Sequence, residues 1–181
     1  MNFELVKKHE GADCLPLPER ATKSSAGYDF RASEDIIIPS YQNIISVLDK
    51  KEKELQRTPW DDPLGLDEIA NLTKGYRPTL IPTGVKCKLE KNQFLQLSVR
   101  SSGPLKHWLI LGNGVGIIDA DYYGNPDNDG EIFFQVINLL PFPIQIRKGD
   151  KIGQGVILNY IVTDEDQASG ERSGGFGSTD A

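Results

Sequence analysis

Alternating apolar and polar residues mark short strands along most of the chain. In the segment 94–99, Leu95, Leu97 and Val99 are apolar whereas Gln96 and Ser98 are polar, the period of a strand with one face in a core. Segment 131–139 is almost continuously apolar, which predicts a strand buried on both faces. The same criteria, with Gly and Pro as boundaries, predict strands at 3–6, within 27–38, and at 80–89, 108–111, 115–118, 144–146 and 152–162.

The apolar segments 108–111 and 115–118 flank Gly112-Asn113-Gly114. An Asn-Gly pair favours the positive φ angles that tight hairpin turns require. The pattern therefore predicts that these two segments are the paired arms of one hairpin.

Between residues 40 and 76 the apolar period changes from two to about 3.6. Ile44, Val47, Leu48 and Leu55 recur near helical spacing, and segment 66–74 predicts a second short helix that Gly75 ends. We interpret 40–76 as a helical insertion in an otherwise all-β domain that spans residues 1–162.

From Thr163 the chain becomes polar and rich in glycine. Too little apolar surface remains for this segment to fold alone, which predicts a flexible C-terminal arm over residues 163–181. Arg172 and Phe176 lie close together among glycines, so the arm is either a plain mobile terminus or a segment that closes over a site.

Composition and charge limit the function classes. The 181 residues suit one domain, and the net charge of −6 argues against a general nucleic-acid coat, although a few local cations could still hold a small anionic substrate. Cys14 and Cys87 form no zinc motif or disulfide framework. The sequence has no apolar run of membrane-spanning length and no signal-peptide pattern, which predicts a cytoplasmic protein without a membrane partner.

Two segments carry the strongest candidate chemistry. Arg100-Ser101-Ser102 follows a predicted strand and could bind phosphate oxygens, or it could be a surface arginine before a serine helix cap. Asp119 and Asp121 follow another strand, and one carboxylate could deprotonate a water; the alternative is a turn in which Asp side chains accept backbone N–H groups.

Two further segments are weaker alone. Asp29 lies two residues after Gly27 and could contact the hydration shell of a magnesium ion, and Gln154 could donate a hydrogen bond from the turn at 149–154. Taken alone, each segment is better explained as an ordinary turn without a function. The two histidines do not support a histidine metal site or a Ser-His-Asp triad, and no glycine-rich phosphate loop of known pattern is present.

Taken together, five blocks in order resemble the all-β, trimeric dUTP pyrophosphatases (dUTPases). They are Ala26-Gly27-Tyr28-Asp29-Phe30, Arg100-Ser101-Ser102, the stretch 112–124, the stretch 149–154, and the stretch 172–179 with its Gly-Gly-Phe-Gly-Ser-Thr motif. The helical insertion and the turn at 124–130 are both longer than the connections usual in that family.

The resemblance implies a jelly-roll-like β-barrel and a homotrimer whose active sites are shared between subunits. It implies Mg²⁺-dependent hydrolysis of dUTP to dUMP and pyrophosphate, which limits uracil incorporation into DNA and supplies dUMP for dTMP synthesis. Asp119 would activate the water, Asp29 would contact Mg²⁺ through water, and the substrate-binding residues would be Arg100, Ser101, Ser102, Asn113, Gly116, Ile118, Tyr122, Gln154, Arg172, Phe176, Gly177, Ser178 and Thr179.

Among these, Asn113 and the adjacent backbone would read uracil, and Tyr122 would pack under the deoxyribose. Phe176 would stack on the base while Arg172, Ser178 and Thr179 close over the triphosphate. The alternatives are a dCTP deaminase of the same fold, or a regulator that uses this fold to bind a protein partner through the helical insertion.

Overall fold

The computed structural model describes residues 1–11, 15–54, 62–74, 77–170, 172 and 174–175. Twelve strands, three α-helices and two 3₁₀ helices occur there. The strands are β1 (Asn2–Leu5), β2 (Glu19–Arg20), β3 (Tyr28–Arg31), β4 (Ile36–Ile38), β5 (Thr79–Pro82), β6 (Val85–Lys88), β7 (Gln93–Ser98), β8 (Leu109–Leu111), β9 (Gly116–Asp119), β10 (Phe133–Asn138), β11 (Ile144–Ile146) and β12 (Lys151–Asn159). The helices are α1 (Gln42–Glu54), α2 (Leu66–Leu72), α3 (Ser102–His107), η1 (Lys7–His9) and η2 (Ala120–Tyr122).

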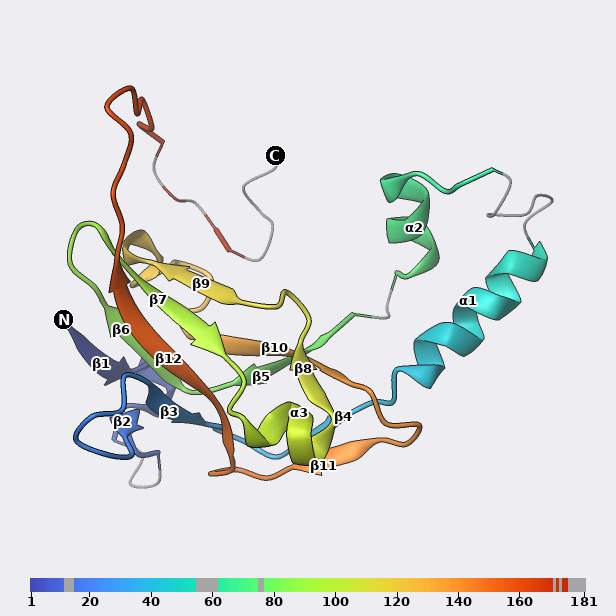
Figure 1. Cartoon of the computed structure of the whole chain (residues 1–181), viewed down its shortest axis with the longest axis horizontal. Coiled ribbons are helices and arrows are strands. Elements are labelled where there is room, and N and C mark those ends of the chain that lie inside the picture. Colours follow the sequence, from blue (N-terminus) through green and yellow to red (C-terminus); the bar gives the residue numbers. More distant parts are fainter. Residues whose placement is uncertain (12–14, 55–61, 75–76, 171, 173, 176–181) are drawn as a thin grey trace.

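The strands form four antiparallel sheets around one core. The largest has the order β2-β3-β12-β7-β9, and the others are β5-β10-β8, β1-β6 and β11-β4. Their hydrogen-bonded ladders do not close into one continuous barrel. The all-β, jelly-roll-like class predicted from the sequence is confirmed, with sheets that pack around a common core in place of a closed ladder (Figure 1).

Two strands carry much of that core. Leu95 and Leu97 of β7 are buried, as their alternation predicts, and they pack in the same cluster as Phe134 and Val136 of β10. On β10 only the even-numbered residues are buried, whereas the odd-numbered residues are half-buried. The prediction that this strand is buried on both faces is therefore wrong for the single chain, because β10 has a strand on each side but an open second face.

The predicted hairpin around Asn113 is also wrong. A tight turn does exist, with Gly114 at φ +69° and its N–H bonded to the Leu111 carbonyl at 3.1 Å. However, β8 pairs with β10 whereas β9 pairs with β7, so the turn carries the chain from one sheet to another. Trp108 is not in the strand at all, because it ends α3 in the left-handed conformation.

The helical insertion is present as predicted. Helices α1 and α2 lie to one side of the sheets and project away from them (Figure 1). Their apolar side chains include Ile45, Leu66 and Ile69, which are all exposed. Leu55 and Gly75 lie outside the described residues.

Several strand boundaries differ from the sequence pattern. Gly84, at φ +71°, divides the predicted strand at 80–89 into β5 and β6, which join different sheets. Strand β12 ends at Asn159, and residues 160–162 continue without regular structure. None of the described helices is long and apolar enough to cross a membrane.

Candidate active site

The predicted phosphate-binding residues meet on three adjacent strands. In the ladder, Gln154 of β12 lies opposite both Asp29 of β3 and Ser98 of β7. Arg100 lies two residues after Ser98, just beyond the end of β7. Residues distant in sequence therefore form one row on a sheet face, because directly opposed residues of antiparallel strands point to the same side.

Asp29 holds two cations in this row. Its Oδ1 lies 3.0 Å from Arg100 Nε, and its Oδ2 lies 2.7 Å from Lys151 Nζ. Asp29 is buried, whereas the two cationic side chains are about one-third exposed. One carboxylate thus orients two cations, and the excess positive charge faces solvent, where it attracts anions. The sequence reasoning missed Lys151, although it lies within the stretch 149–154 that was singled out.

Gln154 is fixed by close packing against Gly27. A Cβ built on Gly27 would lie 2.7 Å from the Gln154 Oε1, so a larger residue there would displace the amide. Behind it, Gly153 faces the core, where a Cβ would lie only 2.0 Å from Phe134 Cε1. These two glycines explain why the β12 segment that carries Gln154 passes so close to its neighbours.

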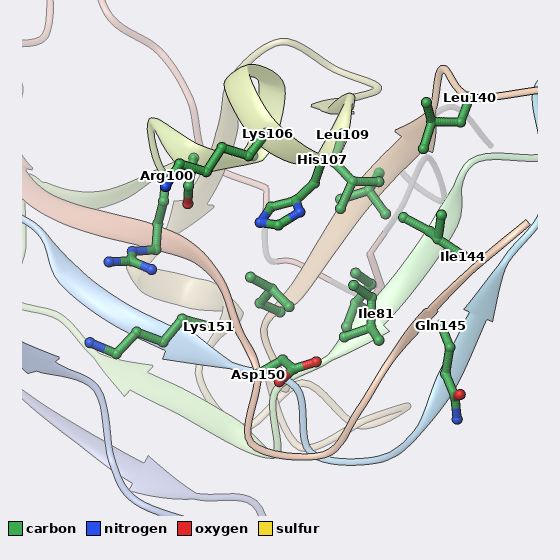
Figure 2. A pocket seen from close by; sticks show the side chains of 15 residues that line it. Ile81, Arg100, Lys106, His107, Leu109, Leu140, Ile144, Gln145, Asp150 and Lys151 are labelled. Carbon is green, nitrogen blue, oxygen red and sulfur yellow. The ribbon is translucent and has the colours of Figure 1, made fainter.

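Ser101 and Ser102 begin helix α3. Ser101 is exposed and makes no side-chain capping hydrogen bond, so the serine-cap alternative does not hold for it. Ser102 and Arg100 border a cavity of about 490 Å³ between α3 and strands β11 and β12. Figure 2 shows basic side chains, including Lys106 and Lys151, on one side of this cavity and apolar residues such as Ile81 and Ile144 on the other.

A second group of predicted residues lies at the other end of β7. Asp119 ends β9 and stands opposite Phe94, the second residue of β7. A cavity of about 190 Å³ adjoins it, and its lining includes Asn113, Gly116, Ile118, Asp119, Tyr122, Arg172 and Gly175. The structure thus places most of the predicted nucleoside-binding residues beside Asp119, the predicted general base.

Arg172 pairs with both candidate acids in this chain. Its guanidinium contacts the Asp119 carboxylate and lies 2.8 Å from Asp121 Oδ1. The two acids share this partner although Asp119 ends a strand and Asp121 lies in the 3₁₀ helix η2. Asp119 makes no side-chain capping hydrogen bond, so it is not the turn-forming Asp of the alternative interpretation.

Tyr122 forms one wall of this smaller cavity. Its side chain is buried, the Arg172 guanidinium lies 5.7 Å from its ring centre, and its Oη accepts a hydrogen bond from Asn128 Nδ2 at 2.6 Å. Burial raises the pKa of the Tyr122 phenol, and the hydrogen bond from Asn128 offsets part of that rise. The phenol therefore stays neutral near pH 7. The sequence analysis did not identify Asn128.

The two groups lie apart on the sheet, and the members of each that border a cavity border different ones. Four residues along β7 and two strand spacings separate the α-carbons of Asp119 and Gln154, which corresponds to about 16 Å. Arg100 and Lys151 line the larger cavity, whereas Asp119 and Arg172 line the smaller one. Among the described residues, no charged residue lines both cavities. Phe176, Gly177, Ser178 and Thr179 lie outside the described residues.

The donor set suits a magnesium ion bound mainly by its ligand. Mg²⁺ in nucleotide enzymes usually keeps several waters and takes one or two carboxylates together with substrate phosphates. Asp29 provides one carboxylate beside Arg100, a predicted phosphate-binding residue, and beside Lys151. The described residues contain no group of three or more His, Cys, Asp or Glu that could hold a metal by themselves.

Comparison with known proteins identifies the family. A dUTPase family model matches residues 68–180. The deoxyuridine 5'-triphosphate nucleotidohydrolase of Lactococcus lactis is 36% identical over 181 residues, covering 99% of this chain and 97% of that protein. The protein of the same name from Caulobacter vibrioides is 31% identical, covering 96% of this chain and 91% of the other.

Solved structures agree with this assignment. The crystal structure of the dUTPase from Streptococcus mutans has a TM-score of 0.65 and 30% sequence identity, and it covers 91% of this chain and 99% of its own. The dUTPase of phage phi11 of S. aureus, whose structure was described for its species-specific insert, shares the fold with a TM-score of 0.59 at 18% identity. On the extent and consistency of these matches, the chain belongs to the dUTPase family.

Proposed function

We propose that this dUTPase hydrolyses dUTP to dUMP and pyrophosphate by attack of a water on the α-phosphorus. The observation that carries the proposal is the arrangement of two groups on one sheet. The half-exposed acid Asp119 borders a small cavity at one end, and a row of cationic side chains around Arg100 lies at the other end. The reaction needs a carboxylate near the bound nucleoside to take a proton from water, and it needs cations to stabilise the charge on the polyphosphate.

In this mechanism Asp119 is the general base. Its carboxylate takes a proton from the attacking water while the cations stabilise the charge that moves onto the leaving pyrophosphate. Arg172 contacts the Asp119 carboxylate, so its guanidinium would move aside for a water to bind there. The triphosphate offers the guanidinium a more highly charged partner, which favours that transfer.

The remaining roles follow from position. Asn113, Gly116 and Ile118 would contact uracil, and Tyr122 would pack against the deoxyribose. Arg100, Ser101, Ser102 and Gln154 would bind the phosphates. Phe176 would stack on the base, with Gly177 allowing close approach and Ser178 and Thr179 bonding the phosphates. These last four assignments rest on the resemblance of the tail motif alone.

Membership of the family carries dependence on a divalent metal, and we propose Mg²⁺. Asp29 would hold it through water, beside the phosphates that Arg100 and Lys151 bind. When bound, the ion would neutralise phosphate charge and orient the triphosphate. The cations Arg100 and Lys151 pre-order the Asp29 carboxylate for this contact.

We further propose a homotrimer in which each active site combines residues of different subunits. The proposal is supported by the separation of about 16 Å between the Asp119 group and the Gln154 row. Arg100 and Lys151 of the row line one cavity and Asp119 lines another, so a second copy that brings its phosphate row to Asp119 would complete the site. A cytoplasmic location fits a substrate that belongs to the nucleotide pool for DNA synthesis.

One assay tests the reaction directly. Pyrophosphate release is measured with dUTP, dCTP, dTTP and UTP, each with Mg²⁺ and with a chelator, and ammonia release is followed in parallel. We expect rapid pyrophosphate release from dUTP with Mg²⁺ and at least 10²-fold lower kcat/KM for the other nucleotides. Ammonia release from dCTP, or no turnover of dUTP, would contradict the proposal.

A further inference from the structure

The loop that joins η2 to β10, residues 124–130, is held by its own hydrogen bonds. The Asp129 N–H donates to the Asn125 carbonyl at 2.7 Å, and the Asp127 N–H donates to Asn125 Oδ1 at 3.0 Å. The Glu131 N–H donates to the Asn128 carbonyl at 3.1 Å. This loop is longer than the family turn that it resembles, and the reaction described above gives it no role.

The loop is also fixed to the rest of the fold. Asp129 Oδ2 accepts hydrogen bonds from Lys86 Nζ at 2.8 Å and from the Lys7 N–H at 2.9 Å. Burial raises the pKa of Asp129, but the bonds and charges of Lys86 and Lys7 outweigh it and lower the pKa below its ordinary value. Asp129 is therefore ionised at neutral pH, and the buried Lys86 ties the loop to β6.

Asn128 is oriented by this loop toward Tyr122. Its Oδ1 accepts the Gly130 N–H at 3.0 Å, which turns its Nδ2 to donate to the Tyr122 Oη at 2.6 Å. Gly130 has φ +80°, and a Cβ there would lie 2.6 Å from the Tyr122 carbonyl oxygen. The glycine is thus required for the close approach of the loop to Tyr122.

We propose that Asn128 is a positioning residue that holds the Tyr122 ring in place and thereby contributes to the discrimination between deoxyribose and ribose nucleotides. The inference rests on the proposed function, in which Tyr122 packs against the sugar. A ring that excludes a 2′-hydroxyl by contact does so only if it cannot move aside. A hydrogen bond at Oη restrains the ring at the point farthest from its backbone, where small rotations move it most.

The test compares kcat/KM for dUTP and for UTP in the wild type and in Asn128→Ala. Because an apolar pocket rejects an added hydroxyl by about 10²-fold, loss of the restraint should lower the dUTP/UTP ratio by about tenfold. The fall should come mainly from improved use of UTP, with kcat for dUTP changed only a few-fold. Affinity for dUMP against UMP, measured by calorimetry, should shift in the same direction without any turnover.

Three variants separate positioning from loop damage. Asn128→Asp keeps an acceptor for the Gly130 N–H and can accept from the Tyr122 hydroxyl, so it should retain most of the discrimination. Tyr122→Phe should lower the ratio as Asn128→Ala does, and the double variant should lower it no further. Asp127→Ala, an exposed change in the same loop, should leave the ratio unchanged.

The outcomes are distinct from those of the proposed function. A wild type that does not hydrolyse dUTP would overturn the reaction itself. A wild type that hydrolyses dUTP, with an Asn128→Ala variant that stays folded and keeps the dUTP/UTP ratio within twofold, would overturn the positioning role. An equal effect of Asn128→Ala in the Tyr122→Phe background would also overturn it, because the effect would not pass through the phenol oxygen.

Discussion

The two acids of the candidate site differ in environment, and the difference assigns their roles. Asp29 is buried, and each of its carboxylate oxygens contacts a cation, which fixes the side chain within the sheet. The Asp119 side chain is half exposed, and its partner Arg172 belongs to the C-terminal arm. Asp119 can therefore be uncovered without breaking the fold, which suits a general base.

Replacement of Asp119 by Asn should lower kcat for dUTP by roughly 10²–10⁴-fold, since the amide keeps the shape and loses the base. Binding of a non-hydrolysable dUTP analogue, measured by calorimetry, should change little. Asp121→Asn is the matched control, because Asp121 contacts the same guanidinium but lies further from the cavity; we expect a few-fold effect. Turnover of Asp119→Asn close to the wild-type rate would refute the assignment.

The Lys86–Asp129 pair should stabilise the fold in a pH-dependent way. Its hydrogen bond raises the pKa of Lys86, and it contributes to the lowered pKa of Asp129. A lowered carboxyl pKa gives stability that is present above the unfolded pKa near 3.8 and is lost as pH falls through the folded value. A raised lysine pKa gives stability that is present below 10.5 and is lost as pH rises through the folded value.

Lys86→Met should therefore lower the free energy of unfolding by about 2 kcal/mol at pH 7, the scale of a hydrogen bond between charged groups. Urea unfolding at constant chain concentration measures it, and the deficit should shrink as pH falls below the Asp129 transition. Lys88→Met, an exposed change on the same strand, should alter stability by less than about 0.5 kcal/mol. A pH-independent deficit would contradict the role of the Asp129 charge.

At the level of elements, the sequence predicted local conformation better than pairing. The period of two in β7 and the helical period of α1 are local signals, and both elements are present. The turn at Gly114 was also predicted, but not the partners of its flanking strands, because β8 and β9 pair with strands far away in the sequence. Pairing depends on which sheet buries each strand, and no local pattern encodes that.

The insertion should be dispensable for catalysis. Helices α1 and α2 project away from the sheets (Figure 1). Neither helix contains a predicted site residue or a described residue that lines either candidate cavity. Replacement of residues 43–76 by a short Gly-Ser linker should leave kcat/KM for dUTP within a few-fold. Ser40 is retained, because its Oγ donates to the Leu140 carbonyl at 2.8 Å.

Loss of turnover by this variant, with fold and oligomeric state intact, would show that the insertion reaches an active site. As a matched control, Leu66→Ser and Ile69→Ser remove exposed apolar side chains of α2 without shortening the chain, and both should leave the thermal midpoint unchanged. A retained rate in all three variants would show that catalysis does not need the insertion. Binding of a protein partner would then remain the alternative role for it.

At the scale of the whole molecule, the sequence predicted a set of site residues, and the fold shows how they are distributed over one chain. Motif order and resemblance identified Asp119 and Arg100, whereas their separation along β7 became visible only in the fold. Lys151 was missed because its partner Asp29 is far away in the sequence. Asn128 was missed although Tyr122 is only six residues away, because no local pattern shows that the loop turns its amide back onto the phenol. The proposed sharing of sites between subunits rests on this division into two cavities.

Complementation between inactive chains tests that division. Asp119→Asn removes the base and Arg100→Ala removes a phosphate cation, so each variant alone should be nearly inactive. If every site combines Asp119 of one subunit with Arg100 of another, random mixed trimers of the two variants contain about a quarter of intact sites. Co-refolded mixtures should then recover up to about a quarter of wild-type turnover, measured as pyrophosphate release, with light scattering to establish the trimer.

A site contained in one chain gives a different result, because each mutant chain then carries its own defect into every site. The mixture would show only the sum of the two residual activities, at any mixing ratio. Mixing the folded variants without unfolding them is the control, since exchange of subunits is needed for recovery. Full activity of a monomer would refute shared sites outright, whereas recovery that follows the product of the two mole fractions would establish that Asp119 and Arg100 act across a subunit boundary.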